Sequence, residues 1–447
     1  MPTVAPGVAT PESSPPDAAA AAARPRVAID LRALVPAPTG IGVHTRSLAV
    51  ALARRGGMRY VGMAHRPPQG AEELAAAGVE IERPAAPRVP LGVVWQQLVL
   101  PWRLRRGDVD LLWSPLMTLP LACPVPGVVT VHDLTVLLMP EAHRAKVRAS
   151  LLPFLAASLR RARRVVAVSR ATAGDLAAQF PGVAAKLRVV YNGVDDEFRP
   201  GTAEEIAATR EALGAPHGYL LYAGTLEPRK NVGALLDAWE SLAADDPHFP
   251  PLVLAGPYGW GSRGLARRIA RLAAAGGGGA GGGSTGAGLA AGDDGDNGGD
   301  AGAGTGAGLV RGAAPRADAR EAAGAAGPRL LPLGRLDRGH LVRVFQAASL
   351  FVYPSLYEGF GLPPAEALAC GVPAVVLDSS SLPEVVGDAG MLVAPGDTAA
   401  LAAALARLVT EPALAAELAG RAVAQASRFR WERAAAEMEE VFREALA

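Results

Sequence analysis

The sequence predicts an α/β protein with two doubly wound, Rossmann-like domains that face each other across a cleft. The chain has 447 residues, which is too long for one ordinary core. Half of the residues are apolar and only 5% are aromatic, which favours Ala- and Leu-rich helices packed on Val-rich strands. Short β-branched segments alternate with helical patterns along most of the chain, and this alternation indicates mostly parallel sheets covered on both faces.

The first domain is predicted over residues 26–198. A strand at 26–34 is followed by a loop at 36–42 and by an amphipathic helix that stops at Gly56 and Gly57. Further strands, most of them separated by helical patterns, are expected at 59–63, 109–113, 127–131, 164–168 and 187–190. A segment rich in turn-forming residues then closes this unit.

The second domain is predicted over residues 199–427, and it repeats the alternation. A helix is expected near 231–244, and strands are expected at 219–224, 251–256, 330–334, 350–355, 372–377 and 390–394. Ligands of such folds bind at the carboxyl ends of the parallel strands. We therefore expect a ligand site in the cleft between the two domains.

Two segments are expected to lie outside both cores. Residues 1–25 are rich in Pro, Ala and Ser and carry no secretory signal pattern, so they are interpreted as a disordered tail. Residues 276–327 consist mainly of Gly and Ala and contain no aromatic side chain. Such a segment buries too little apolar surface to offset its ordering entropy, and it is interpreted as a disordered surface insertion.

The composition limits the classes of function. A net charge of +1 gives no broad electrostatic case for binding nucleic acid. The basic run at 160–164 is either a solvated helix face or a patch for a membrane surface or an anionic acceptor. Cys123 and Cys370 are interpreted as two buried thiols, with one disulfide as the alternative, and no apolar run of about 18 residues is present to span a bilayer. We expect a cytoplasmic protein, free or held peripherally at the inner face of the membrane, with no metal or cofactor.

The strongest candidate site lies at 353–373. A strand runs into a loop that contains Gly359 and Gly361, and two prolines then open a helix. The glycines let the backbone approach an anion closely, and the helix N-terminus offers free N–H groups, so the segment predicts a pyrophosphate cradle. Glu358 at the strand's end and Glu366 in the helix's first turn are placed to grip opposite ends of one elongated ligand.

In this context the two glutamates resemble the Glu-x7-Glu signature of family 4 retaining glycosyltransferases, which have the two-domain GT-B architecture. The resemblance implies that Glu358 contacts the hydroxyls of the donor sugar and that Glu366 contacts the ribose of the nucleotide. It also implies that the donor diphosphate lies against the backbone of Gly359, Phe360, Gly361 and Leu362. Without the resemblance, each glutamate is equally an ordinary exposed carboxylate.

A second block, 222–240, also resembles this family. There the resemblance implies that Lys230 binds the donor diphosphate, and a cation is needed to neutralise a departing phosphate in a sequence without a metal motif. Arg229 either adds to this charge or only forms a salt bridge. Many members of the family carry an arginine where this chain has Thr225, so the donor contact implied for that position is the weakest match.

Two matches fall in the first domain. The glycine pair Gly40 and Gly42 is a simple tight turn by itself, and the resemblance implies that it contacts the donor phosphates. His132 follows the strand predicted at 127–131 and matches the family's histidine beside the donor sugar; otherwise it is a core or capping histidine. Residues 428–447 resemble the last helix of the family, which crosses back onto the first domain.

The implied reaction is transfer of a hexose from a nucleoside diphosphate sugar to an acceptor hydroxyl, with retention and without a metal. GDP-mannose is the preferred donor, because 224–231 and 355–367 resemble bacterial mannosyltransferases of surface-glycan assembly. The expected acceptor is a lipid-linked glycan or glycolipid.

Other functions remain open on the sequence alone. A UDP-sugar-dependent glucosyl or N-acetylglucosaminyl transferase would have the same fold. A nucleotide-sugar epimerase would consume UDP-N-acetylglucosamine without an acceptor, and a non-catalytic binding protein would hold the donor without turnover. A glycoside hydrolase would need two carboxylates facing each other across one bond and would have no use for a diphosphate cradle.

Overall fold

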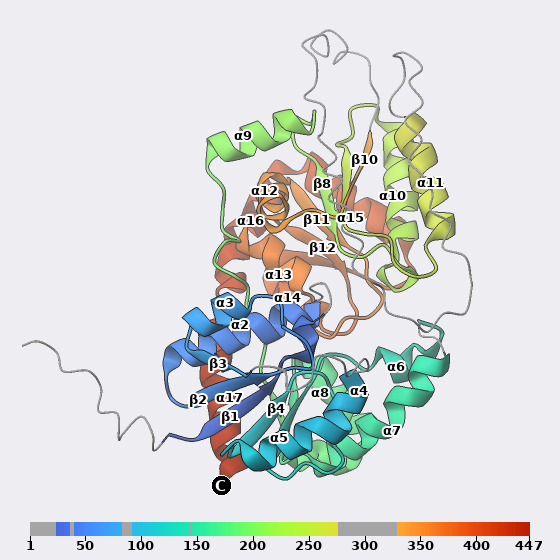
Figure 1. Cartoon of the computed structure of the whole chain (residues 1–447). Helices are drawn as coiled ribbons and strands as arrows, with labels where there is room; N and C mark the ends of the chain where they lie inside the picture. The colour runs from blue at the N-terminus through green and yellow to red at the C-terminus, as the bar shows by residue number, and fades with distance from the viewer. Residues whose placement is uncertain (1–23, 36–39, 83–91, 143–144, 276–328) are drawn as a thin grey trace, which may run out of the picture.

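The computed structural model describes residues 24–35, 40–82, 92–142, 145–275 and 329–447. Within them the chain forms two α/β halves, each built on one parallel sheet with helices on both faces (Figure 1). The predicted fold class of two doubly wound domains is therefore confirmed. The insertion predicted at 276–327 and nearly all of the tail predicted at 1–25 lie outside the described residues.

The first half contains a seven-stranded sheet in the order β3-β2-β1-β4-β5-β6-β7. Every neighbouring pair is parallel. Its strands are β1 (Arg26–Asp30), β2 (Arg59–Met63), β3 (Val79–Ile81), β4 (Leu111–Ser114), β5 (Gly127–Val131), β6 (Arg164–Ala167) and β7 (Leu187–Val189). Its helices are α2 (Gly40–Arg55), α3 (Ala71–Ala76), α4 (Gly92–Val94), α5 (Leu100–Arg106), α6 (Thr135–Leu138), α7 (Ala145–Arg161) and α8 (Arg170–Gln179).

The second half contains a six-stranded sheet in the order β10-β9-β8-β11-β12-β13, again parallel throughout. Its strands are β8 (Leu220–Ala223), β9 (Leu252–Ala255), β10 (Leu330–Gly334), β11 (Leu350–Tyr353), β12 (Ala374–Leu377) and β13 (Gly390–Val393). The helices that follow β7 are α9 (Ala203–Ala212), α10 (Val232–Asp245), α11 (Arg263–Ala275), α12 (Arg338–Ala347), α13 (Leu362–Ala369), α14 (Leu382–Val386), α15 (Thr398–Thr410), α16 (Pro412–Ala426) and α17 (Trp431–Leu446).

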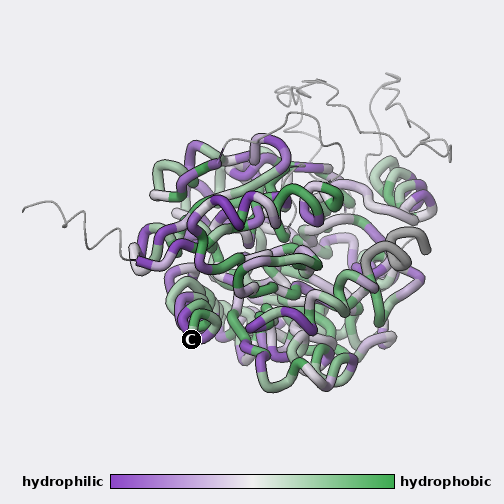
Figure 2. The backbone as a smooth tube through the Cα atoms, turned by 60° about the horizontal axis from the view of Figure 1, so that its bottom comes forward, coloured by the Kyte–Doolittle hydropathy of each residue, from purple (hydrophilic) through white to green (hydrophobic). Residues whose placement is uncertain are grey.

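The central strands are buried along their whole length because helices cover both faces of each sheet. All residues of β4, β8, β11 and β12 are buried, as expected for parallel strands inside an α/β layer structure. Figure 2 shows hydrophobic and hydrophilic stretches alternating along the backbone of both halves, in keeping with elements that each bury one part of their surface.

The last helix, α17, belongs to the core of the first half although it follows the second half in sequence. Its residues Trp431, Met438 and Phe442 are buried in one cluster with residues of α2 and β1. The strand β7 ends at Val189, and the chain then passes to the second half and returns through α17. The two halves are consequently connected by two crossings of the chain (Figure 1).

Some predicted boundaries were wrong for local physical reasons. The strand predicted at 26–34 ends at Asp30, whose carboxylate accepts a hydrogen bond from the Arg32 amide at 3.2 Å and starts a 3₁₀ turn over Leu31–Leu34. A short polar side chain of this kind offers the backbone a local alternative to the sheet ladder. The short strand β3, with residues Val79–Ile81, was not predicted.

Two further corrections affect the predicted site. Helix α2 begins at Gly40, so the glycine pair lies in the first turn of a helix and not in the preceding loop. Helix α13 begins at Leu362, immediately after Gly361, so Glu366 is its fifth residue and lies in the second turn rather than the first. Strand β11 stops at Tyr353, which leaves Glu358 on the connecting loop instead of at the strand's end.

Among the described residues, no single helix is long and apolar enough to cross a membrane. The pair α15 and α16 reaches the required length and composition only when the two are taken together, and they are bent by 95° at the break. Buried side chains of both helices, including Leu401, Leu405 and Leu418, pack in the core of the second half.

Candidate active site

The sheet order of the second half brings two of the predicted motifs together. β8 and β11 are neighbours and parallel, so the loops after their carboxyl ends lie side by side. Lys230 follows β8 through the 3₁₀ turn Pro228–Lys230, and Glu358 follows β11. The amide of Leu356 donates to the carbonyl of Arg229 at 3.0 Å, and Arg229 Nη1 donates to the carbonyl of Tyr357 at 2.5 Å.

The Glu358 carboxylate is buried among cations and hydroxyls. It forms an ion pair with Lys230, accepts a hydrogen bond from Ser355 Oγ at 2.6 Å, and lies 3.4 Å from Arg229 Nη1. Lys230 also donates to the hydroxyl of Tyr353 at 2.7 Å. Burial alone would raise the pKa of Glu358, but the charges of Lys230 and Arg229 outweigh it and hold the pKa below its ordinary value. The carboxylate is therefore ionised at neutral pH.

A row of amides follows Glu358. Gly359, Phe360 and Gly361 donate no backbone hydrogen bond to any described residue. Gly361 has φ of +101°, a conformation that favours glycine, and it is the N-cap residue immediately before α13. The next residues after Leu362 are prolines, which have no N–H group. The amides available to an anion are therefore confined to residues 359–362.

The two halves of the protein touch at Gly359. A Cβ atom on this residue would overlap the carbonyl oxygen of His132, which follows β5 in the first half. Thr172, in the first turn of α8, donates through Oγ1 to the carbonyl of Gly359 at 3.1 Å. Only glycine permits this approach, so the residue predicted to sit beside an anion also lets the two halves close on each other.

His132 is held in one tautomer by its neighbours. Its Nε2 atom lies 2.8 Å from the carbonyl oxygen of Pro115, and because a carbonyl only accepts, Nε2 carries the proton. Burial lowers the pKa of His132, so the ring is neutral near pH 7 and Nδ1 is left as an acceptor. The buried ring of His44 lies edge-on to it, with the centroids 4.7 Å apart.

His44 connects the glycine pair of α2 to His132. It lies in the first turns of α2, two residues after the buried Gly42, while Gly40 is exposed at the helix start. Its Nδ1 lies 2.8 Å from Asn192 Oδ1, and its Nε2 is buried without a hydrogen-bond partner among the described residues. Burial and the neighbouring His132 hold the pKa of His44 well below its ordinary value. The N-terminal part of α2 and His132 therefore lie close together.

The Glu366 carboxylate has a different environment. It is buried in α13, and the nearest cation is Arg338, whose Nη1 lies 3.7 Å away. Arg338 also forms an ion pair with Asp195 and lies 3.2 Å from Glu197, so it is shared between three carboxylates. Burial raises the pKa of Glu366 to about 7, and Arg338 offsets this only in part.

The remaining predicted residues lie at the edge of this arrangement. The ring of Phe360 packs with Val168, Val385 and Phe429 in a cluster that joins the two halves, and Leu362 packs against it. A ligand contact from Phe360 would therefore come through its backbone. Thr225 follows β8, and its carbonyl accepts a hydrogen bond from Tyr222 at 3.0 Å.

The sequence did not single out Glu384, which joins the two halves. This residue of α14 accepts hydrogen bonds from the amides of Arg170 and Ala171, at 3.1 and 3.0 Å, and from the Tyr191 hydroxyl at 2.8 Å. Its carboxylate thereby caps the N-terminus of α8, a helix of the other half. In sequence, Ser381 and Glu384 have the spacing of a local capping box, which predicts a contact within α14 instead.

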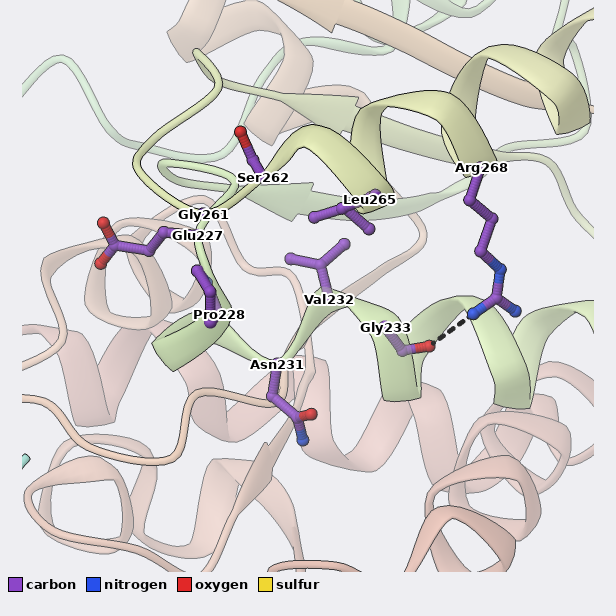
Figure 3. A pocket seen from close by; sticks show the side chains of 10 residues that line it. Glu227, Pro228, Asn231, Val232, Gly233, Gly261, Ser262, Leu265 and Arg268 are labelled. Atoms are coloured by element: carbon purple, nitrogen blue, oxygen red, sulfur yellow. Dashed lines mark hydrogen bonds between the residues drawn. The ribbon is translucent and has the colours of Figure 1, made fainter. Parts of the chain in front are cut away.

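A cavity of about 330 Å³ lies on the second half, between the turn Pro228–Lys230 and the start of α11 (Figure 3). Its lining includes Asn231, Leu265 and Arg268, and Arg268 reaches over it to the carbonyl of Gly233 at 3.4 Å. Lys230, Glu358, Glu366 and His132 do not line it. Lys230, Glu358 and His132 are instead buried near the place where the two halves meet at Gly359.

Two family models match the chain and together cover more than half of it. Residues 38–198 match Glycosyltransferase Family 4, and residues 307–411 match Glycosyl transferases group 1. The fold and these two matches define the chain as a glycosyltransferase of GT-B architecture.

Individual relatives agree with the family. The chain is 29% identical to the O-antigen chain mannosyltransferase B of Escherichia coli over 307 residues, which are 68% of this chain and 67% of the relative. It is 33% identical to a D-inositol 3-phosphate glycosyltransferase of Saccharomonospora viridis over 293 residues, which are 64% of this chain and 56% of the relative. The chain therefore spans little more than half the length of the second relative.

The fold is similar to that of a solved structure. The structure of Anabaena Alr3699/HepE in complex with UDP and glucose superposes with a TM-score of 0.64, at 20% sequence identity. The superposition covers 94% of this chain and 99% of that one. At this identity the likeness establishes the architecture of two facing α/β domains.

Proposed function

We propose that this glycosyltransferase moves a hexose from a nucleoside diphosphate sugar to an acceptor hydroxyl, with retention of the anomeric configuration and without a metal ion. The observation that carries the proposal is the ion pair between Glu358 and Lys230 beside the amides of residues 359–361, which donate to no residue that the structure describes. A carboxylate suits the hydroxyls of a sugar, and a cation with a row of amides suits a diphosphate.

In the proposed reaction, the bond between C1 of the sugar and the diphosphate oxygen breaks while the bond between C1 and the acceptor oxygen forms on the same face. The acceptor proton passes to the departing phosphate oxygen, so no enzymic base is required. Lys230 and the amides stabilise the charge that develops on the phosphate. Glu358 and the Nδ1 atom of His132 accept hydrogen bonds from the sugar hydroxyls and fix its position. Glu366 accepts a hydrogen bond from the ribose.

GDP-mannose is the proposed donor. Its support is the 29% identity to a mannosyltransferase, together with the segments 224–231 and 355–367. A UDP-sugar is the alternative, because the similar structure of Alr3699/HepE was determined with UDP and glucose. The two donors share the diphosphate and a hexose, so both fit the same arrangement of Lys230 and Glu358.

The proposed acceptor is a sugar hydroxyl of a lipid-linked glycan or glycolipid, used at the inner face of a membrane. The name of the Escherichia coli relative, an O-antigen chain mannosyltransferase, supports a growing glycan chain. The name of the Saccharomonospora viridis relative contains a small phosphorylated molecule, D-inositol 3-phosphate, and a soluble acceptor is therefore the alternative for this chain.

The proposal is tested by incubating the protein with GDP-mannose and a lipid-linked oligosaccharide, with and without EDTA, and by determining the anomeric configuration of the product by NMR. We expect an α-linked product and equal rates in the two conditions. A β-linked product would contradict retention, and loss of the rate in EDTA would contradict the metal-free mechanism. Turnover of UDP-sugars alone would replace the donor. Release of free sugar without an acceptor product would contradict transfer.

A further inference from the structure

One surface of the first half exposes large apolar side chains along a single helical segment. Residues 92–106 continue without a break from α4 through a π-helical turn, Trp95–Val99, into α5. Trp95, Leu100 and Leu104 on one side are buried in the core. On the other side Leu98 is 71% exposed and Trp102 is 46% exposed. A monomeric soluble protein seldom leaves such side chains together on its surface.

The exposed side chains form one continuous face. Val94, Leu98 and Trp102 follow each other at intervals of four residues, the spacing of neighbours on one helix face. Leu121 is also exposed, and it adjoins them because its amide donates to Gln97 Oε1 at 2.8 Å. We call these four residues, together with Arg105 and Arg106 at the end of α5, the docking face.

The docking face ends in positive charge. Arg105 and Arg106 are exposed at the last turn of α5, and the Arg106 guanidinium lies 4.1 Å from the centroid of the Trp102 ring. Neither arginine forms an ion pair with a described carboxylate, and residues 92–106 contain no Asp or Glu. Apolar side chains and a tryptophan next to unneutralised arginines are typical of helices that lie in the interface of an anionic bilayer.

A neighbouring helix adds charge of the same sign. α7 ends in Arg160 and Arg161, which are exposed and have no carboxylate partner among the described residues. α7 lies next to the docking face, because the amide of Leu119 donates to Ser158 Oγ at 2.8 Å while Gln97 donates to the carbonyl of Leu119 at 3.3 Å. α7 and the helical segment 92–106 lie side by side in Figure 1.

The docking face lies within reach of the candidate site. The carbonyl of Pro115 accepts the hydrogen bond from His132, and Leu121 is six residues further along the same chain segment. Six residues span at most about 22 Å. A sugar attached to a lipid in the bilayer would therefore be presented close to His132.

We propose that the docking face binds an anionic bilayer, with Val94, Leu98, Trp102 and Leu121 in the interface and Arg105 and Arg106 at the lipid phosphates. The inference rests on the proposed function in one respect: an enzyme whose acceptor is linked to a lipid must work at a membrane. The binding itself requires neither donor nor acceptor, so the two proposals can fail separately.

The experiment is co-sedimentation of the full chain with vesicles of phosphatidylcholine, with or without phosphatidylglycerol. We expect at least a tenfold preference for the anionic vesicles, reduced by salt. The double variant Leu98→Glu/Trp102→Glu should lose at least tenfold in partitioning, and each of Arg105→Gln and Arg106→Gln should lose about fivefold. Leu392→Glu, which places the same charge on an exposed leucine of β13 in the other half, should bind as the wild type does.

Three results would overturn the proposal. One is equal sedimentation of the wild type with both kinds of vesicle, or with neither. Another is an equal loss in the Leu392→Glu control. A third is a concentration-dependent dimer that the double variant abolishes while no vesicles are bound, because the face would then join two copies of the chain. Thermal shifts with GDP and UDP, and the far-UV circular dichroism of each variant, report separately on donor binding and folding.

Discussion

Each end of the candidate site contains a glutamate, and the pKa values of the two glutamates are shifted in opposite directions. Glu358 and Glu366 are both buried, yet the pKa of the first lies below its ordinary value and that of the second is raised to about 7. Glu358 is paired with Lys230 and lies 3.4 Å from Arg229, whereas the cation that pairs with Glu366 among the described residues is Arg338, which is shared with Asp195 and Glu197. The difference teaches that the spacing of a motif places two carboxylates, while their neighbours decide the charge that each one carries.

Removing the cation at the Glu358 end should have the largest effect. Lys230→Met leaves Glu358 with Arg229 alone and takes away the charge proposed to stabilise the departing phosphate. We expect kcat to fall by about 10²-fold or more, and Glu358→Gln to cost a similar factor. Steady-state kinetics of transfer measure both, with Arg407→Gln on the exposed face of α15 as the control that keeps its activity. Rates within about twofold of the wild type in both site variants would show that this end is not catalytic.

The contact between the two halves should be the next most sensitive feature. In Gly359→Ala, the added methyl group would overlap the carbonyl of His132 and force the halves apart at the Glu358 end. We expect transfer to fall by about 10-fold to 10²-fold, since a displacement of about 1 Å is enough for such a loss. Gly174→Ala in α8 has open space around the new methyl group and should keep its activity. Equal activity of the two variants would mean that the closed contact is not used in catalysis.

The raised pKa of Glu366 should make the free energy of unfolding depend on pH. Because the folded protein holds the proton of Glu366 more tightly than the unfolded chain does, its contribution to stability is present below about pH 4 and is lost as the pH rises through about 7. The free energy of unfolding of Glu366→Gln relative to the wild type should therefore increase over this range, by on the order of 3 kcal/mol. Denaturant unfolding of both proteins at several pH values measures it. A difference that does not change with pH would contradict the raised pKa.

The smallest expected effect concerns Glu384. Glu384→Gln removes the negative charge that caps α8 from the other half but keeps one acceptor oxygen. The cost should be about 1 kcal/mol of helix-end stabilisation, seen as a few-fold rise in the KM for the donor with little change in kcat. Glu417→Gln, in an exposed pair on α16, should leave KM unchanged. A fall in kcat without a change in KM would place Glu384 in the chemistry rather than in closure of the two halves.

The sequence predicted the architecture well because the alternation of buried strands and helices is a local pattern. It also singled out Lys230 and Glu358, whose proposed roles remain predictions. It did not predict that these two side chains pair, because this depends on β8 and β11 being neighbours although β9 and β10 intervene in sequence.

Two other features of the site were beyond prediction for related reasons. His44 lies beside His132 only because α2 covers that edge of the sheet, and a single histidine near a helix start carries no signal for such a contact. Glu384 has the spacing of a local cap, and its true partner, the N-terminus of α8, is more than 200 residues away. Contacts between the halves depend on how complete domains pack, which short sequence patterns do not encode.

The most direct test of the central claim, that the Lys230–Glu358 end of the cleft binds the sugar diphosphate, is isothermal titration of the wild type and Lys230→Met with GDP-mannose, GDP and UDP-glucose. We predict that the wild type binds GDP-mannose more tightly than UDP-glucose and that Lys230→Met weakens binding at least tenfold. Binding of UDP-glucose alone, with the same loss in the variant, would keep the site and change the donor. Equal binding by the two proteins, or no binding of any of the three by the wild type, would contradict the account.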